Sequence, residues 1–143
     1  MKIKVLLFIL LFSFSATKAD TISSWKVFYN NLKICSLTQY TKNNIEIHTS
    51  QYKKGDYLAI QYSDDTPCYE CEYEIEVVGE GKTSVFKEKF KNKYKLVKID
   101  LKNLIDDNFK SKNNPSLFVV YFSEVDKKGR KDRGTRLLNI QIK

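Results

Sequence analysis

The sequence predicts an all-β protein: a single antiparallel β-sandwich of about seven to eight strands with one short helix or helical turn. The first observation is a period-2 alternation of apolar and charged side chains, clearest over 72–78, where three glutamates alternate with Tyr73, Ile75 and Val77. Such alternation is typical of strands with one buried face. The second observation is that short alternating segments recur every 8–12 residues or so, separated by turn-forming residues as at 54–56.

The expected strands cover residues 25–29, 45–47, 58–62, 72–78, 83–90, 95–101, 117–125 and 138–142. Segment 117–125 is apolar on both faces, which indicates a central strand. Leu101, Leu104, Ile105 and Phe109 have helical spacing, which predicts the short helix. The side chains that we expect in the core are Trp25, Ile34, Ile47, Ile60, Ile75, Phe86, Ile99, Val120 and Ile140.

One hairpin can be predicted in register. A turn centred on residues 80–81 pairs the segment 72–78 with the segment 83–90 in antiparallel orientation. Opposite charges then share one face and apolar residues share the other, which stabilises the pairing. The predicted opposite pairs are Glu74 with Lys87, Glu72 with Lys89, Ile75 with Phe86 and Cys71 with Phe90.

Residues 1–19 have the layout of a secretory signal peptide. Two lysines precede an apolar stretch at 5–14, and small residues precede a cleavage site after Ala19. Neither this stretch nor the longest later apolar run, 117–122, is long enough to span a bilayer as a helix. We therefore expect a mature β-sandwich domain of residues 20–143 that is secreted or periplasmic and does not span a membrane.

The chain is basic, with a net charge of +8 from 25 basic and 17 acidic residues. The leader holds Lys2, Lys4 and Lys18, so removing it leaves 8 − 3 = +5. Charge of this sign favours anionic partners. We expect an exposed basic loop between the last two strands to be the binding site, with the residues Lys127, Lys128, Arg130, Lys131, Arg133 and Arg136.

The partner of this loop is expected to be an unknown protein or an anionic envelope surface. Nucleic acid is disfavoured, because the loop has no aromatic side chain for base stacking and the chain is expected to be exported.

Three cysteines, Cys35, Cys68 and Cys71, remain after the leader. In an oxidising compartment we expect one disulfide, with Cys68 and Cys71 as the first candidates and Cys35 as an alternative partner. Two further hypotheses use the same side chains. The Cys68-x-x-Cys71 pair would suit a thiol–disulfide oxidoreductase, and the three cysteines with His48 would suit a closed tetrahedral metal site.

No catalytic constellation is present. The chain has a single histidine and no Gly-x-Ser-x-Gly motif, so a serine hydrolase is disfavoured. We expect no cofactor and no enzymatic activity. The favoured function is that of an exported, non-catalytic binding module.

Three features occur together: Trp25 near the mature N-terminus, the strand Gly-Asp-Tyr-Leu-Ala-Ile-Gln-Tyr at 55–62, and a basic run before the closing Leu-Leu-Asn-Ile-Gln-Ile at 137–142. In these features the chain resembles small secreted bacterial β-sandwich proteins that have no assigned activity. The resemblance implies a fold class and no particular chemistry.

Overall fold

The alternating segments form strands in the computed structural model, which describes residues 22–65, 70–91, 94–110, 116–126, 128–132 and 134–143, without the side chains of 108–110. The described residues contain nine strands: β1 (Ser24–Tyr29), β2 (Leu32–Thr38), β3 (Asn43–Ile47), β4 (Tyr57–Ser63), β5 (Glu72–Val78), β6 (Ser84–Phe90), β7 (Leu96–Asp100), β8 (Leu117–Val125) and β9 (Thr135–Ile142). The predicted all-β class is confirmed, and β2 is the strand that the sequence analysis did not assign.

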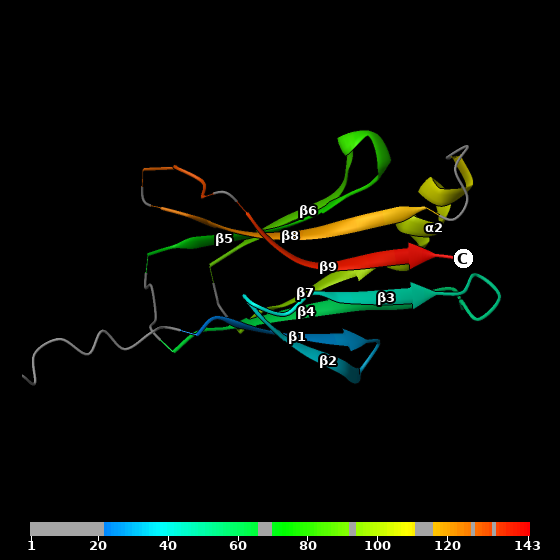
Figure 1. Ribbon diagram of the computed structural model, residues 1–143, viewed down its shortest axis with the longest axis horizontal. Coiled ribbons are helices and arrows are strands. Elements are labelled where there is room, and N and C mark those ends of the chain that lie inside the picture. The colour runs from blue at the N-terminus through cyan, green and yellow to red at the C-terminus, as the bar shows by residue number, and fades with distance from the viewer. Residues whose placement is uncertain (1–21, 66–69, 92–93, 111–115, 127, 133) are drawn as a thin grey trace, which may run out of the picture.

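The strands form two sheets that pack face to face (Figure 1). Sheet A has the order β2-β1-β4-β7, and sheet B has the order β3-β9-β8-β5-β6. The two sheets share one apolar interior, because buried side chains from both belong to the same core cluster. This is the arrangement of a β-sandwich.

The sequence predicts antiparallel pairs throughout, but one pair of strands is parallel. β3 runs parallel to β9, with Asn43 opposite Leu138 and Ile47 opposite Ile142. A parallel pair requires a long connection between its strands, and here the connection is most of the domain.

The core prediction is confirmed at seven positions. The buried residues are Trp25, Ile47, Ile60, Ile75, Ile99, Val120 and Ile140. Phe86 is half-buried and packs against this core. Between the sheets, the rings of Trp25 and Tyr62 from sheet A contact Phe122 from sheet B, with centroids 5.2 Å and 4.5 Å apart.

The prediction that Ile34 belongs to the core is wrong, since 41% of this residue is exposed. The β1–β2 register shifts between Val27, which faces Cys35, and Phe28, which faces Lys33. Ile34 is the extra, unpaired residue of this bulge, so its side chain does not follow the alternation that would point it into the core. It lies on an edge strand, which has a neighbouring strand on one side only.

The predicted register of the β5–β6 hairpin is wrong by two residues. Tyr73 faces Phe90 and Val77 faces Phe86, because the 3₁₀ turn η1 (Glu80–Lys82) lengthens the connection. A two-residue displacement leaves each side chain on its face, since the side-chain period is two. The predicted ion pairs therefore still form as diagonal contacts, at 3.3 Å for Glu74 with Lys87 and 3.4 Å for Glu72 with Lys89.

The predicted short helix is confirmed as α2 (Leu101–Lys110). The backbone N–H of Lys102 donates to Oδ1 of Asp100 at 2.8 Å, which satisfies one free donor of the first turn. Leu101, Leu104 and Ile105 are buried in the shared core. The helix thus extends the apolar interior beyond the two sheets.

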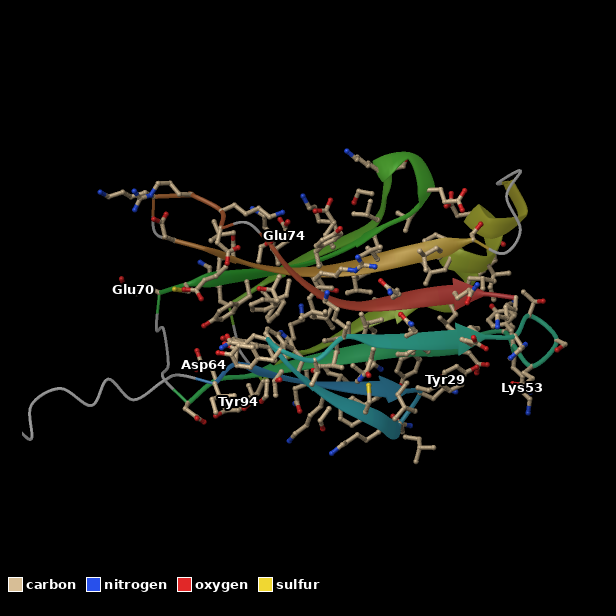
Figure 2. All side chains as sticks on the ribbon, viewed as in Figure 1. Tyr29, Lys53, Asp64, Glu70, Glu74 and Tyr94 are labelled. Atoms are coloured by element: carbon tan, nitrogen blue, oxygen red, sulfur yellow. The ribbon has the colours of Figure 1, made fainter. Side chains whose placement is uncertain are left out.

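A polar network fixes the β1–β2 turn to the start of β4, at the end of the sandwich where Figure 2 labels Tyr29. The Tyr29 hydroxyl donates to Oδ2 of Asp56 at 2.7 Å, and Nδ2 of Asn30 donates to Oδ1 at 3.0 Å. Asn30 has a φ of 53°, which asparagine tolerates better than most residues. Burial and the Asp56 carboxylate raise the pKa of Tyr29 to about 12.

Replacing Ile75 by alanine should lower the free energy of unfolding by about 2–5 kcal/mol, because its side chain is fully buried. The matched change Ile34→Ala should cost less than about 1 kcal/mol, since Ile34 is partly in water already. Urea unfolding of both variants measures the difference. Equal losses would contradict the assignment of Ile34 to the bulge.

Candidate functional site

The predicted basic loop connects β8 and β9. Its tip is closed by backbone hydrogen bonds from Asp126 N–H to the carbonyl of Arg130 at 3.1 Å and from Gly129 N–H to the carbonyl of Asp126 at 2.9 Å. Gly129 has a φ of 74°, a conformation that favours glycine. The loop is therefore an ordered hairpin end in its described residues.

The six predicted binding residues differ in their surroundings. Lys127 and Arg133 lie outside the described residues. Lys128 is exposed, and among the described residues it forms no ion pair. Arg130 pairs with Asp126 at 2.6 Å, and Nε of Arg136 donates to Oδ1 of Asn139 at 3.0 Å.

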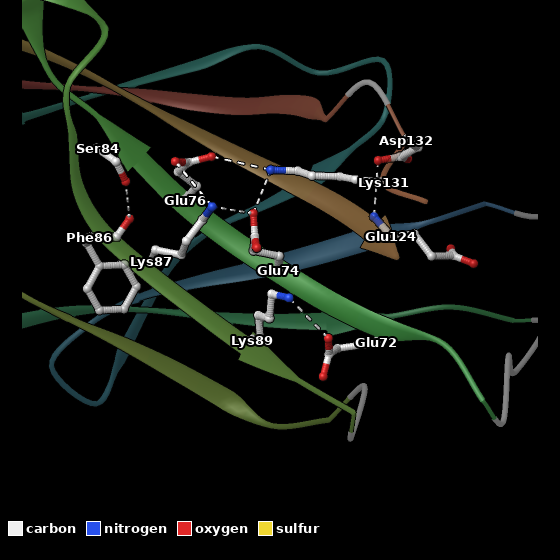
Figure 3. Close-up of polar contacts among 10 residues, drawn as sticks. All are labelled: Glu72, Glu74, Glu76, Ser84, Phe86, Lys87, Lys89, Glu124, Lys131 and Asp132. Carbon is white, nitrogen blue, oxygen red and sulfur yellow. Dashed lines mark hydrogen bonds and ion pairs between the residues drawn. The ribbon is translucent and has the colours of Figure 1, made fainter. Parts of the chain in front are cut away.

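Lys131 turns back from the loop onto sheet B (Figure 3). Its Nζ donates to Oε1 of Glu74 at 2.6 Å and to Oε2 of Glu76 at 3.4 Å. Lys87 approaches the same two carboxylates from β6, at 3.3 Å and 3.7 Å. Two lysines from different elements thus hold two neighbouring glutamates of β5.

Glu74 is the centre of this cluster, because only 2% of it is exposed. Burial alone would raise the pKa of Glu74, but the hydrogen bonds and charges of Lys131 and Lys87 outweigh burial and lower it. The same carboxylate raises the pKa of Lys131. Both groups are therefore ionised near neutral pH.

A shallow hollow of about 430 Å³ lies beside this cluster on the outward face of sheet B. Its lining includes Glu76, Tyr121, Ser123, Lys131 and Gly134. A Cβ at Gly134 would lie 2.9 Å from Oγ of Ser123, so a larger residue there would require the Ser123 side chain to shift. Lys131 is held protonated by Glu74, so it is unsuited to act as a base toward Ser123.

Cys35, Cys71 and His48 lie in different parts of the described fold. Cys35 is a free, half-buried thiol on β2, and burial raises its pKa. His48 is exposed after β3. In the described ranges no three His, Cys, Asp or Glu side chains are placed to hold a metal ion. Cys68 lies outside those ranges, so the four-ligand metal site stays a prediction.

Cys71 is buried just before β5 and, unlike Cys35, is not a free thiol. Its Sγ lies 2.8 Å from Oε1 of Glu124. Burial, and then the charges of Asp132 and Asp64, raise the pKa of Glu124. Redox-active cysteines instead lie at helix N-termini or near cations. The oxidoreductase hypothesis also needs Cys68 and stays a prediction.

The sequence analysis did not single out the outward face of sheet A. The strands of sheet A contain three lysines and one aspartate, whereas those of sheet B contain six glutamates and three basic residues. The three lysines of sheet A are Lys26, Lys33 and Lys98, all exposed, and none has an ion pair with another described residue. Charge is therefore segregated between the two faces of the sandwich.

Strand register places these lysines on one face. Lys33, Phe28, Ala59 and Lys98 lie opposite one another in a single row across all four strands. Lys26 lies in the adjacent row, between Ser36 and Gln61. Directly opposite residues project to the same side of a sheet. Trp25 and Val27, the neighbours of Lys26, point into the core, so this side faces outward.

Aromatic side chains form part of the same face. Nζ of Lys98 lies 4.5 Å from the ring centroid of Tyr57, and Phe28 is half-buried between the outer strands. Asp100, the sole acidic residue in the strands of sheet A, accepts a hydrogen bond from the backbone N–H of Lys102 through its carboxylate. The face therefore combines unpaired cations with a flat apolar floor.

No known protein family matches this chain, and no curated protein is significantly similar to it.

Among the described residues, there is no helix with the length and apolar character needed to cross a bilayer.

Replacing Lys131 by methionine should raise the pKa of Glu74, because the strongest group that lowers it is lost. In the wild type the ionised carboxylate stabilises the fold above its ordinary pKa of 4.5, and this stability is lost as the pH falls through the lower folded-state pKa. The variant should show a smaller loss of stability over that acidic range. Side-chain NMR titration and urea unfolding at several pH values measure both effects.

Lys89→Met is the control, because Lys89 pairs with Glu72 and not with Glu74. An equal pKa change at Glu74 in both variants would contradict the role given to Lys131.

Proposed function

We propose that this protein is an exported, non-catalytic binding module that attaches to an anionic partner surface, on a protein or on the cell envelope. The observation that carries the proposal is the segregation of charge between the two sheets. The proposed contact surface is the outward face of sheet A, with Lys26, Lys33 and Lys98 at its centre. The exposed tip of the β8–β9 loop, at Lys128, is a second candidate surface.

The ion pairs support this choice of surface. On sheet B, Glu72, Glu74 and Glu76 each have a lysine within 4 Å, so the cations there are partly neutralised. A lysine without a counterion on its own chain gains more from an external anion, because no internal pair has to be broken. Among the residues that the structure describes, the lysines of sheet A have no such counterion.

A non-catalytic role is supported by the Glu74 cluster. Among the described residues, this group of carboxylate and amine side chains with shifted pKa values most resembles an active site. Its members satisfy one another, with Glu74 ionised and Lys131 protonated. Such pairing serves to attach the β8–β9 loop to sheet B, and it leaves neither a proton acceptor nor an unpaired nucleophile in the cluster.

We also propose that residues 1–19 are removed on export to the periplasm or the medium, and that Cys68 and Cys71 form the disulfide. The free thiol of Cys35 on β2 supports this pairing. An oxidising compartment would leave one spare thiol, and burial, which raises the pKa of the Cys35 thiol, lowers the reactivity of that thiol.

Intact-mass spectrometry of the exported protein should therefore give the mass of residues 20–143. Alkylation under denaturing, non-reducing conditions should add a single group, at Cys35. A retained leader would overturn the export proposal, and three alkylated cysteines would overturn the disulfide.

The triple variant Lys26→Gln, Lys33→Gln, Lys98→Gln should bind anionic surfaces about 10–100-fold more weakly than the wild type, since exposed ion pairs contribute about 0.5–1 kcal/mol each. Dextran sulfate beads and phosphatidylglycerol vesicles are the two probes, and co-sedimentation measures the dissociation constant at several salt concentrations.

The charge-matched control is Lys54→Gln, Lys82→Gln, Lys91→Gln, which removes three exposed lysines outside sheet A and outside the β8–β9 loop. It should bind nearly as the wild type does. If both variants bound equally weakly, binding would depend only on the net charge of the protein and not on the face of sheet A. Absence of binding to both probes would refute the proposed function.

A further inference from the structure

We propose that the outward face of sheet A is a docking surface for a linear anionic polysaccharide, a sugar chain bearing carboxylate or sulfate groups. This inference rests on the proposed function, because it names the chemistry of the partner for the same face. The first argument is charge complementarity, since three unpaired lysines and one engaged aspartate make the strands of this face cationic.

The second argument is the geometry of the row Lys33–Phe28–Ala59–Lys98. Its two lysines lie on β2 and β7, three strand spacings apart, or about 14 Å between Cα atoms. Between them lie the half-buried ring of Phe28 and the buried Ala59. A cation at each end and an apolar floor between them fit an extended chain that crosses the strands.

The third argument is the character of that floor. The apolar faces of sugar rings stack on aromatic rings, whose faces are electron-rich. Phe28 and Tyr57 present rings on this side of the sheet, and Lys98 lies over the ring of Tyr57. In the adjacent row, Ser36 and Gln61 flank Lys26 and can hydrogen-bond to hydroxyl groups.

The same floor disfavours a lipid bilayer as the partner. Peripheral membrane binding requires apolar side chains that reach past the cations into the acyl region. In the two rows that contain the lysines, however, Phe28, Ala59 and Leu96 are half-buried or buried, and the exposed side chains are polar: Lys26, Lys33, Lys98 and Ser36. The most exposed apolar residue of sheet A, Leu32, lies at the end of the edge strand.

The test is an NMR titration of the exported protein with polygalacturonate oligomers, with neutral dextran oligomers as control and phosphatidylglycerol vesicles as the competing partner. We expect polygalacturonate to shift amide resonances at Lys26, Phe28, Lys33 and Lys98 and to bind more tightly than the vesicles. The Lys33→Gln, Lys98→Gln variant should bind polygalacturonate roughly tenfold more weakly, the effect of losing two exposed ion pairs.

A second variant, Phe28→Leu, keeps an apolar side chain in the floor and removes the aromatic ring. It should weaken polygalacturonate binding several-fold and leave vesicle binding unchanged, with a thermal melt confirming that it folds. Tighter binding to the vesicles, equal binding of dextran, or no effect of Phe28→Leu would overturn the polysaccharide proposal. The proposed function would still stand in these cases, provided that the triple lysine variant loses binding and the charge-matched control does not.

Discussion

The contact between the two sheets through aromatic rings is the interaction on which the rest of the structure depends. Tyr62 of sheet A lies 4.9 Å from Tyr73 and 4.5 Å from Phe122 of sheet B, measured between ring centroids. Trp25 joins the same group, and its Nε1 has no hydrogen-bond partner in the described structure. Packing and dispersion therefore hold these rings in place. Once they are buried, the alternate side chains of their four strands project away from this interior.

This alternation explains why one fold carries two different surfaces. On sheet B the outward glutamates of β5 form ion pairs with lysines of β6 and of the β8–β9 loop, so their charges are balanced within the protein. On sheet A the outward positions hold lysines beside serine, glutamine and aromatic residues. None of these lysines has an ion pair with another residue that the structure describes. Among the strand residues, basic side chains thus outnumber acidic ones on sheet A and acidic ones outnumber basic ones on sheet B.

Local periodicity was enough to predict the fold class, the helix and most of the core, because alternation and helical spacing are properties of short segments. Ile34 was misplaced because its burial depends on a bulge, which requires the pairing partner of β2. The hairpin register was off by two because side-chain alternation is unchanged by that displacement. The sheet A face could not be predicted, since Lys33 and Lys98 are 65 positions apart in the sequence and share a face only because of the strand order.

The parallel pairing of β3 with β9 has a consequence for the order in which the molecule assembles. Segment 43–47 is an edge of sheet B, yet its only strand partner in the described structure is segment 138–142. The C-terminal Lys143 adds a backbone hydrogen bond to Ile47 and an ion pair to Glu46. A growing chain cannot close sheet B until residues 138–142 have been synthesised, and contacts of this sequence separation form slowly. The β3 edge of sheet B is therefore among the last parts of the fold to form, because it requires the segment that contains β9.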